Sequence, residues 1–467
     1  RGGGKYNKSS SSSLSSSQPS YAHIQIPTDA STAATTTTLA RDNIVGSQII
    51  GFGVYNPSSM YRVRILLHET SDPVTFTAVR NILSSSINSG SNINNDDQPV
   101  IIGDDRHAQS NAMSLILRAK LKEAARSRLA LNLPNSDTDS FRLVNGEGDS
   151  LSGLAVDVLG GRVAVVMSSA AWCELYKEEI TQSLAHVLKD VYGSAAAADD
   201  DDDASELEIV WRTTESRLKQ DGMVLPSAAD DDDDDAVLED DQFVLAMESN
   251  VKYKVFPWSG QKTGFYCDQR ENRQNLAVLC KGKRVLDLCC YNGGFTMNAA
   301  INGAVKCVGV DSSQDAIDAA TENAALNGLS SDCVSFVRAD ISDYMKMALD
   351  NGEKYDVIIL DPPKLAPSAS ALDQASRKYH SLNRDAIKLI DEERGGLLLT
   401  CTCSSAMTQK DGGQFFLSTV KGASLAARRQ LSLLRTSGAA SCHTQNPAAF
   451  PAGSYLTAAL FHVSPAS

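Results

Sequence analysis

The second half of the chain alternates between short apolar segments and longer amphipathic segments, and this rhythm restricts the possible folds more than any other feature. From Lys281 onward, branched apolar runs predict strands, and most are followed by a polar turn and apolar residues at helical spacing. Such alternation is typical of a parallel sheet doubly wound with helices. The predicted strands cover 284–289, 307–310, 334–337, 357–360, 397–402, 431–435 and 455–463, and the predicted helices cover 295–302, 314–327 and 381–390.

The first half of the chain has a different organisation. Residues 1–20 are rich in Gly and Ser and predict a disordered tail, whereas short alternating segments over 21–70 predict a small, mostly β module. Residues 84–99 are rich in Ser, Asn and Asp and predict a linker. Residues 107–255 mix helical patterns over 112–133 and 176–191 with strand patterns over 141–144, 161–167 and 207–211. They predict a smaller α+β central domain, which precedes the α/β domain over 256–467.

Two acidic runs dominate the charge of the chain. The formal net charge is −14, and the runs at 199–203 and 230–235 contribute eleven carboxylates within the central domain. We interpret both runs as solvated insertions in surface loops. Because the rest of the chain is nearly balanced, the net charge does not argue against an anionic partner.

The composition gives no signal for a metal site or a membrane span. None of the ten cysteines belongs to a C-x-x-C pair, so we expect no metal, and several lie in apolar strand patterns typical of buried, reduced thiols. No apolar run reaches about 18 residues, so we expect no membrane contact. Reduced thiols favour a reducing compartment, and the basic, Ser-rich start leaves both the cytoplasm and an organelle (chloroplast or mitochondrion) open. The oligomeric state is also left open.

A glycine-containing turn follows the first predicted strand of the α/β domain. Asp287 lies within this strand, and Tyr291, Gly293 and Gly294 lie between it and the next helix. Glycines let the backbone approach a ligand closely, and the N–H groups at the start of the helix can bind it. Because open α/β sheets bind ligands at the carboxyl ends of their strands, we predict that these four residues bind a cofactor. A plain turn is the alternative for this motif taken alone.

Acidic residues follow the next two predicted strands. Asp311 lies 24 residues after the aspartate of the first strand, where a carboxylate can accept hydrogen bonds from ribose hydroxyls. Ser312 extends this predicted cofactor contact, and with Asp315 it also has the pattern of a helix cap. Asp340 and Ile341 follow the third strand, where we expect them to meet an adenine amine and ring. A loop carboxylate facing water is the alternative for each acid, but their recurrence along one sheet edge favours cofactor binding.

The fourth predicted strand is followed by Asp361, Pro362, Pro363 and Lys364. This D-P-P motif has no role in dehydrogenases, and the first turn lacks the G-x-G-x-x-G pattern of dinucleotide binding. S-adenosylmethionine therefore fits the predicted site better than NAD. Seven strands that end in a hairpin-like pair likewise favour the Rossmann-like class I methyltransferase fold over the six-stranded dehydrogenase sheet.

A thiol follows the fifth predicted strand, beside the Asp361 loop. Cys401 and Cys403 point to the same face of this strand, and Cys403 lies nearer the ligand-binding edge. Carbon 5 of cytosine is too electron-poor to accept a methyl group unaided, but thiolate addition to carbon 6 makes it nucleophilic. We therefore predict Cys403 as the nucleophile and Asp361 as the acid that holds the base. Burial in the strand is the alternative for Cys403 and our interpretation of Cys401.

The motifs of the site resemble those of a known family. The chain is similar to the bacterial large-subunit ribosomal RNA cytosine-5 methyltransferases with an N-terminal PUA domain, and to their eukaryotic relatives. The resemblance covers most of the chain beyond residue 45. The segments that carry it are 55–59 (YNPSS), 146–154 (GEGDSLSGL), 260–270 (GQKTGFYCDQR), 291–295 (YNGGF), 361–364 (DPPK) and 402–404 (TCS).

This resemblance implies a fold, a cofactor and a substrate. It implies S-adenosylmethionine as the cofactor, RNA as the partner, Cys403 as the nucleophile and a partial PUA-like module over 21–70. It also implies that the segment 262–270 lies near the cofactor and target pocket. The residues implied near the cofactor are Lys262, Thr263 and Tyr266, and those implied for substrate contact are Pro362, Pro363, Lys364, Arg270 and Arg273. For the cations, surface salt bridges are the alternative to phosphate contact.

Our hypothesis is an RNA methyltransferase that extrudes its target base and forms 5-methylcytosine in ribosomal RNA. Methylation of a guanine exocyclic amine by a related fold is one alternative, and it needs no thiol. A non-catalytic RNA-binding scaffold with a degenerate methyltransferase fold is the other, and it need not bind the cofactor.

Overall fold

The chain forms two compact units in the computed structural model. The described residues are 20–26, 48–56, 58–89, 106–192, 207–223, 242–260 and 263–466. The two acidic runs and almost all of the predicted tail lie outside these ranges. The first unit comprises residues 1–116, 169–180 and 215–227, and the second comprises 117–168, 181–214 and 228–467. The predicted central domain is thus divided between the units, and the predicted boundary after residue 255 falls inside the second unit.

A three-stranded antiparallel sheet belongs to the first unit. Its order is β1 (Ser20–Ile26), β2 (Gln48–Tyr55) and β3 (Val63–His68), as the alternating pattern predicted. The helices α1 (Pro73–Ser89), α3 (Ala171–Leu175) and α5 (Glu215–Gln220) complete this unit. Helix α1 corrects the predicted linker at its first six residues, because the helix continues through residue 89. The assignment of this sheet to a PUA-like module stays a prediction.

Buried polar contacts explain why segments distant in sequence join the first unit. Asp221, which follows α5, accepts hydrogen bonds from Arg64 (2.8 Å) and from the backbone N–H of Ala171 (2.8 Å). The Asn56 side chain donates to the backbone carbonyl of Asp221 at 2.7 Å. Because a buried carboxylate needs such partners, these contacts tie residues 169–180 and 215–227 to the β2–β3 turn.

The second unit begins with a four-stranded sheet ordered β4-β5-β6-β7. Its strands are β4 (Phe141–Asn145), β5 (Leu154–Leu159), β6 (Val163–Ser168) and β7 (Glu208–Thr213). The predicted helices are present as α2 (Arg106–Ala130) and α4 (Lys177–Tyr192), and each runs from one unit into the other. A hairpin of β8 (Val244–Glu248) and β9 (Val251–Val255) follows. The sequence pattern missed β5, β8 and β9.

The seven-stranded sheet of the second unit has the predicted class I methyltransferase arrangement. Its order is β12-β11-β10-β13-β14-β16-β15, and only β16 runs antiparallel to the other strands. The strands are β10 (Arg284–Leu288), β11 (Lys306–Asp311), β12 (Val334–Arg338), β13 (Val357–Leu360), β14 (Gly396–Thr402), β15 (Leu431–Ser437) and β16 (Thr457–Val463). All seven agree with the predicted strands within a few residues.

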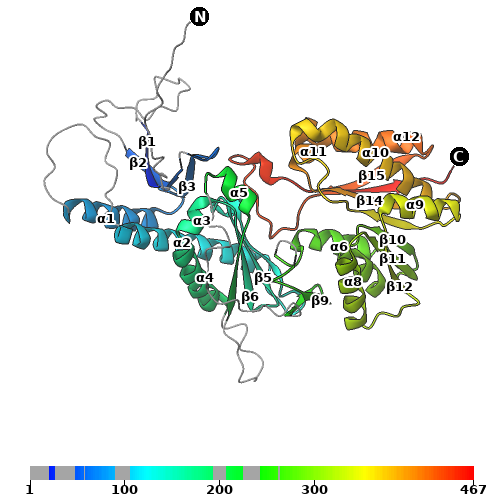
Figure 1. Cartoon of the computed structure of the whole chain (residues 1–467), viewed down its shortest axis with the longest axis horizontal. Coiled ribbons are helices and arrows are strands. Elements are labelled where there is room, and N and C mark those ends of the chain that lie inside the picture. The colour runs from blue at the N-terminus through cyan, green and yellow to red at the C-terminus, as the bar shows by residue number, and fades with distance from the viewer. Residues whose placement is uncertain are drawn as a thin grey trace, which may run out of the picture. The chain divides into compact units, whose positions relative to one another are not determined.

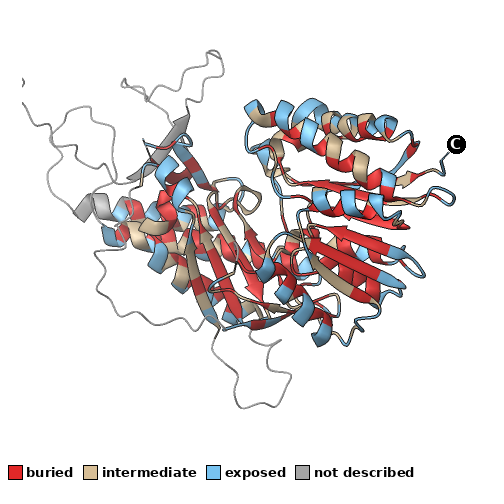
Figure 2. Ribbon diagram, turned by 45° about the vertical axis from the view of Figure 1, so that its right-hand side comes forward, coloured by how far each residue is buried: buried red, intermediate tan, exposed pale blue. Residues whose placement is uncertain are grey.

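Helices cover both faces of this sheet (Figure 1). One face carries α6 (Arg270–Ala277), α7 (Gly294–Ile301) and α8 (Gln314–Leu326), and the other carries α9 (Ile341–Asp350), α10 (Leu372–Leu389) and α12 (Gln414–Ala426). Helix α10 starts nine residues before its prediction. Short turns complete the unit: η1 (Gly146–Asp149), η3 (Cys267–Gln269), η4 (Ala369–Ala371), α11 (Ser405–Gln409), η5 (Lys410–Gly413) and η6 (Pro451–Gly453). Figure 2 shows buried strands between helices whose outer surfaces are exposed.

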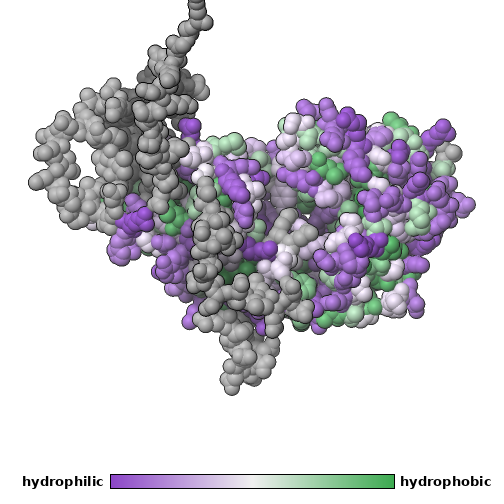
Figure 3. Space-filling model, viewed as in Figure 1, coloured by the Kyte–Doolittle hydropathy of each residue, from purple (hydrophilic) through white to green (hydrophobic). Residues whose placement is uncertain are grey.

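One face of the seven-stranded part is mainly polar (Figure 3). On the side shown in Figure 3, hydrophilic side chains predominate over the seven-stranded part, and apolar ones are scattered between them. Within the described ranges, no helix is long and apolar enough to cross a membrane. All ten cysteines are free thiols.

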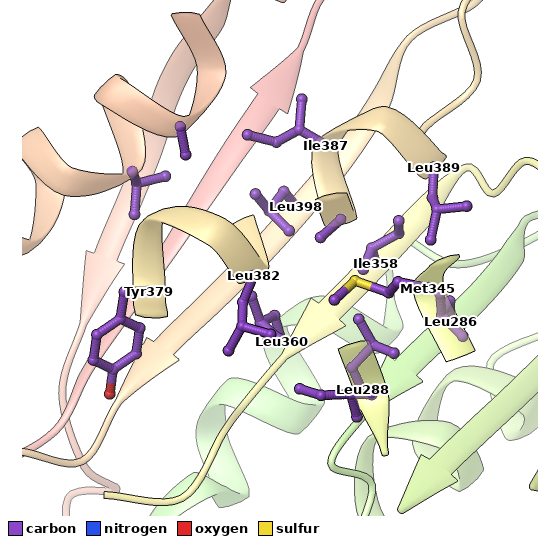
Figure 4. Close-up of a cluster of buried hydrophobic side chains, with 14 of the residues drawn as sticks. Leu286, Leu288, Met345, Ile358, Leu360, Tyr379, Leu382, Ile387, Leu389 and Leu398 are labelled. Carbon is purple, nitrogen blue, oxygen red and sulfur yellow. The ribbon is translucent and has the colours of Figure 1, made fainter. Parts of the chain in front are cut away.

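Alternate residues of the parallel strands point to opposite faces of the sheet. Leu286, Ile358 and Leu398 pack with α9, α10 and α12 in the cluster of Figure 4. Val285 and Val357 pack with α6, α7 and α8 on the other face. Because side chains alternate along a strand, Asp287 and Cys401 share the α6–α7 face. Because strands β10 to β14 are parallel, the polar residues that follow them lie at one edge of the sheet.

Candidate active site

The turn between β10 and α7 is closely packed around its two glycines. Gly293 precedes α7 with φ = 82°, a left-handed conformation that favours glycine. A Cβ atom on Gly293 would lie 3.0 Å from the ring of Phe336, and one on Gly294 would lie 3.0 Å from Cδ of Arg273. Tyr291 also has positive φ (50°). The packing and backbone conformation of the turn therefore require both glycines, and the binding of a cofactor by this turn stays a prediction.

Asp287 lies beneath this turn and is almost completely buried. Its Oδ2 atom accepts hydrogen bonds from the backbone N–H (3.1 Å) and the hydroxyl (2.8 Å) of Thr296 in α7. Its Oδ1 atom is buried and has no hydrogen-bond partner among the described residues. Burial raises the pKa of Asp287 to about 7, and the nearby Asp361 and Asp311 raise it as well. This carboxyl group is therefore suited to a neighbouring cationic group.

Asp311 and Asp340 hold the backbone of the two following turns. Asp311 accepts hydrogen bonds from the N–H groups of Tyr291 (3.0 Å) and Ser313 (3.0 Å). Asp340 caps α9 and accepts from the N–H of Ser342 at 2.7 Å. Burial alone would raise the pKa of Asp340, but hydrogen bonds from the backbone outweigh it and lower the pKa. Both acids lie at the predicted edge, and each still has lone pairs for a ligand.

Ser312 and Ile341, which follow these two acids, do not lie in the surroundings that the sequence predicted. Ser313 and not Ser312 caps α8, because its hydroxyl accepts the N–H of Ala316 at 3.3 Å. This corrects the predicted cap. Ile341 is largely buried and packs in the apolar cluster beneath α9. Its side chain therefore supports the start of the helix.

The D-P-P loop and the thiol lie at the ends of neighbouring strands. Strands β13 and β14 are parallel, with Leu360 paired to Thr400, so that Asp361 and Cys403 both follow at the same edge. Cys403 is partly exposed, whereas Cys401 is fully buried. Pro362 is buried, and Pro363 and Lys364 are exposed. The predicted distinction between the two cysteines is thus present in their burial.

The charges of Asp361 and Cys403 both act on the pKa values of two nearby tyrosines. Burial raises the pKa of Tyr266 to about 12, and Asp268, Cys403 and Asp361 raise it through their charges. Burial also raises the pKa of Tyr379, again with contributions from Cys403 and Asp361. The Tyr379 hydroxyl donates to Thr402 at 2.9 Å. A thiol and a carboxylate are therefore close to both phenol groups.

The segment before α6 reaches this environment, as the resemblance implied. The ring of Tyr266 contacts Tyr291 of the glycine turn edge-on, with 4.9 Å between the ring centres. Gln269 donates from Nε2 to Oδ2 of Asp361 at 2.9 Å. The sequence reasoning missed Gln269, although its position beside a candidate arginine was a signal. Lys262 lies outside the described residues.

Three other predicted residues are held inside the protein. Thr263 donates to Asp157 of β5 at 2.7 Å and is buried. Arg273 forms a buried double ion pair with Glu248 (2.8 and 2.9 Å), and Arg270 is 5% exposed. These placements differ from the predicted phosphate contacts and from surface salt bridges, because both arginines lie in the interior. A buried guanidinium needs fixed partners and is not available to a passing phosphate.

Comparisons with known proteins agree with this geometry. The fold and the sheet-edge site define the chain as a class I methyltransferase. A family model described as S-adenosylmethionine-dependent methyltransferase matches residues 238–426. Ribosomal RNA large subunit methyltransferase I of Aeromonas hydrophila is 35% identical over 337 residues, which cover 72% of this chain and 78% of that relative. The chain belongs to this family of S-adenosylmethionine-dependent methyltransferases.

Further relatives support the same assignment. Ribosomal RNA large subunit methyltransferase I of Escherichia coli is 33% identical over 318 residues, which cover 68% of this chain and 73% of that protein. A crystal structure of a candidate S-adenosylmethionine-dependent methyltransferase from Streptococcus mutans has a TM-score of 0.59. It is 21% identical and covers 75% of this chain and 81% of that chain, so it supports the fold alone.

The residues at the edge fit the family's cofactor, S-adenosylmethionine. The turn after β10 lies at the carboxyl end of the strand, and the buried Oδ1 of Asp287 is an acceptor without a partner among the described residues. A cationic ligand would stabilise the ionised form of this carboxyl. The residues that would hold the cofactor are Asp287, Tyr291, Gly293, Gly294, Asp311 and Asp340.

Proposed function

We propose that this chain is an RNA methyltransferase that forms 5-methylcytosine in ribosomal RNA, with Cys403 as the nucleophile. The observation that carries the proposal is the partly exposed thiol of Cys403, which follows β14 at the same edge of the sheet as the Asp361 carboxylate that follows β13. The printed names of the relatives support ribosomal RNA as the substrate. An amine-methylating site has no use for a thiol at this position.

The chemistry requires a thiol and a methyl donor at the two opposite faces of one flat base. The thiolate of Cys403 adds to carbon 6 of cytosine, which forms a carbon–sulfur bond and moves electron density to carbon 5. Asp361 holds the base through its ring nitrogen and stabilises the protonated form of that nitrogen. The bound cofactor supplies the methyl group that carbon 5 accepts. Loss of the carbon 5 proton to a base then breaks the carbon–sulfur bond and releases the thiolate of Cys403.

Access to the base requires its removal from the RNA helix. A base that is stacked in a duplex cannot present both faces to a thiol and a methyl donor, so the target is extruded or already unpaired. Pro363 and Lys364 lie exposed beside Asp361, where a rigid proline and a cation suit a nucleotide and its phosphate. Arg270 and Arg273 are not part of this proposal, because they are buried.

The test uses RNA that contains 5-fluorocytosine. The fluorine on carbon 5 cannot leave as a proton does, so the full chain should accumulate a covalent RNA adduct when cofactor is added. Peptide mapping should place the adduct on Cys403. The variant Cys403→Ala should form no adduct and should lose methyl transfer by roughly 10⁴-fold or more.

Cys401→Ala is the matched control, because Cys401 lies two residues away in the buried part of the strand. It should keep adduct formation and should retain methyl transfer within a few-fold of the unsubstituted chain. Full methyl transfer by Cys403→Ala would contradict the thiol mechanism and favour methylation of an exocyclic amine. Failure of calorimetry to detect S-adenosylmethionine binding would instead favour a scaffold.

A further inference from the structure

Three polar side chains form a hydrogen-bonded chain that ends at Asp361. Ser437 at the end of β15 donates to Oδ1 of Asn272 at 2.6 Å. Asn272 in α6 donates from Nδ2 to Oε1 of Gln269 at 2.6 Å, and Gln269 donates to Asp361 at 2.9 Å. Asn272 and Gln269 are 4% and 5% exposed. We call Asn272 and Gln269 the side-chain relay.

The direction of every bond in this relay follows from one carbonyl group. Nδ2 of Asn272 also donates to the backbone carbonyl of Gly438 at 3.1 Å. A carbonyl only accepts hydrogen bonds, so the nitrogen of the Asn272 amide must face it. The same nitrogen faces Oε1 of Gln269, which leaves Nε2 of Gln269 to face Asp361. The carboxylate therefore meets a donor and never the amide oxygen.

The surroundings of Gln269 restrict it further. The Gln269 side chain also lies near the buried Cys401 thiol, where it opposes the rise in pKa that burial causes. The amide thus lies between the end of β14 and the loop after β13. A carboxylate bonded to such a fixed donor cannot turn without losing this partly buried hydrogen bond.

We propose that Gln269 is a positioning residue, which is oriented by Asn272 and sets the direction in which Asp361 presents its carboxylate to the target base. This inference rests on the proposed cytosine chemistry, in which Asp361 must meet a ring nitrogen. Because Gln269 acts through Asp361, its loss affects the chemical step and leaves cofactor binding in place.

The first test replaces Gln269 with a side chain of similar length that cannot donate. In the full chain, Gln269→Met should lower kcat for RNA methylation by roughly 10- to 100-fold, because a small misplacement of a catalytic group is sufficient. The KM for RNA and the Kd for S-adenosylmethionine should stay within a few-fold. The double variant Gln269→Met/Asp361→Asn should be no slower than Asp361→Asn alone, since both changes remove one function.

The second test changes only the orientation of Gln269. Asn272→Asp keeps the size of the side chain but removes the donor that selects Oε1 of Gln269. The Gln269 amide is then free to turn its oxygen toward Asp361, and kcat should fall as it does in Gln269→Met. Ser437→Ala is the matched control and should stay within about threefold of the unsubstituted chain, because Gly438 still fixes the Asn272 amide.

These outcomes separate the relay from the proposed function. No 5-fluorocytosine adduct in the unsubstituted chain would count against the cytosine mechanism, whatever the variants do. An adduct that Gln269→Met and Asn272→Asp form at the unsubstituted rate would overturn the relay and leave the cytosine mechanism intact. Additive losses in the double variant, or loss of folding in both single variants, would assign these side chains to packing and would also overturn the proposal.

Discussion

The carboxylates at the edge of the seven-stranded sheet are held in two different ways. In the cofactor half, which follows β10, β11 and β12, Asp287, Asp311 and Asp340 bond to groups near the start of the next helix. In the thiol half, which follows β13 and β14, Asp361 is bonded by Gln269, 92 residues away in the sequence. Each carboxylate of the cofactor half thus accepts a hydrogen bond from a residue that follows it closely in the sequence, whereas Asp361 in the thiol half is bonded by a distant segment. The two halves can be perturbed separately.

The largest expected effect in the cofactor half is that of Gly293→Ala. The left-handed backbone and the contact with Phe336 should together lower the free energy of unfolding by about 2 kcal/mol. Displacement of the turn should weaken S-adenosylmethionine binding by at least about tenfold. Calorimetry and denaturant unfolding measure the two effects.

Gly328 provides the control for backbone strain alone. Its φ is also positive (66°), but a Cβ atom there would have no neighbour within 4 Å. Gly328→Ala should destabilise the chain by about 1 kcal/mol and leave the cofactor Kd unchanged. Equal cofactor affinity in Gly293→Ala and Gly328→Ala would show that the packing of the turn is unimportant for binding.

The second expected effect is a pH dependence of stability and of cofactor affinity, which arises from the buried Asp287. Its pKa in the folded chain, about 7, lies above the ordinary value of 3.8, so the folded state favours the protonated form. Its contribution to stability is therefore fully present below pH 3.8 and is lost as the pH rises through about 7. A cationic cofactor prefers the ionised form, so its affinity should rise by about tenfold between pH 6 and pH 8.

Asp287→Asn should remove this pH dependence of the cofactor Kd. The substitution keeps the shape of the side chain but has no charge to titrate. A titration series by calorimetry at several pH values compares the two proteins. An unsubstituted chain whose Kd does not change between pH 6 and 8 would show that Asp287 is not coupled to the cofactor.

The smallest expected effect is that of the cap at Asp340. Asp340→Ala should lower the free energy of unfolding by about 1 kcal/mol, because α9 loses its capping acceptor. Asp340→Ser should restore the stability. It should still bind S-adenosylmethionine about fivefold more weakly, because a hydroxyl is too short to reach the adenine amine. Unchanged affinity in Asp340→Ser would limit Asp340 to its capping role.

The parts of the site that could be predicted from the sequence are those built by nearby residues. The glycine turn, Asp311 and Asp340 each follow a strand whose apolar pattern was visible, and the parallel topology places their positions at one edge. The separation of Cys403 from Cys401 also followed from the position of each residue along β14. These inferences required only periodicity and the rule that parallel strands end on the same side.

The arginines show where this reasoning failed. The sequence left phosphate contact and a surface salt bridge as alternatives for Arg273, but its partner Glu248 lies on the buried side of β8, a strand that the pattern missed. Strand β8 is short and follows a segment dominated by acidic residues, so its apolar pattern is weak. Charge alone does not distinguish a buried ion pair from a surface cation.

The sequence by itself determined the order of the strands along the chain, the bare turn after β10, and the acids and thiol that follow the strands. Each of these depends on residues that are neighbours in the chain, whose spacing reflects the geometry of helices and strands. Only the tertiary structure decided that Gln269 and Asn272 hold Asp361 and that Arg270 and Arg273 lie in the interior. Their hydrogen-bond partners come from separate strands, and burial is a property of the packed chain that local spacing does not specify.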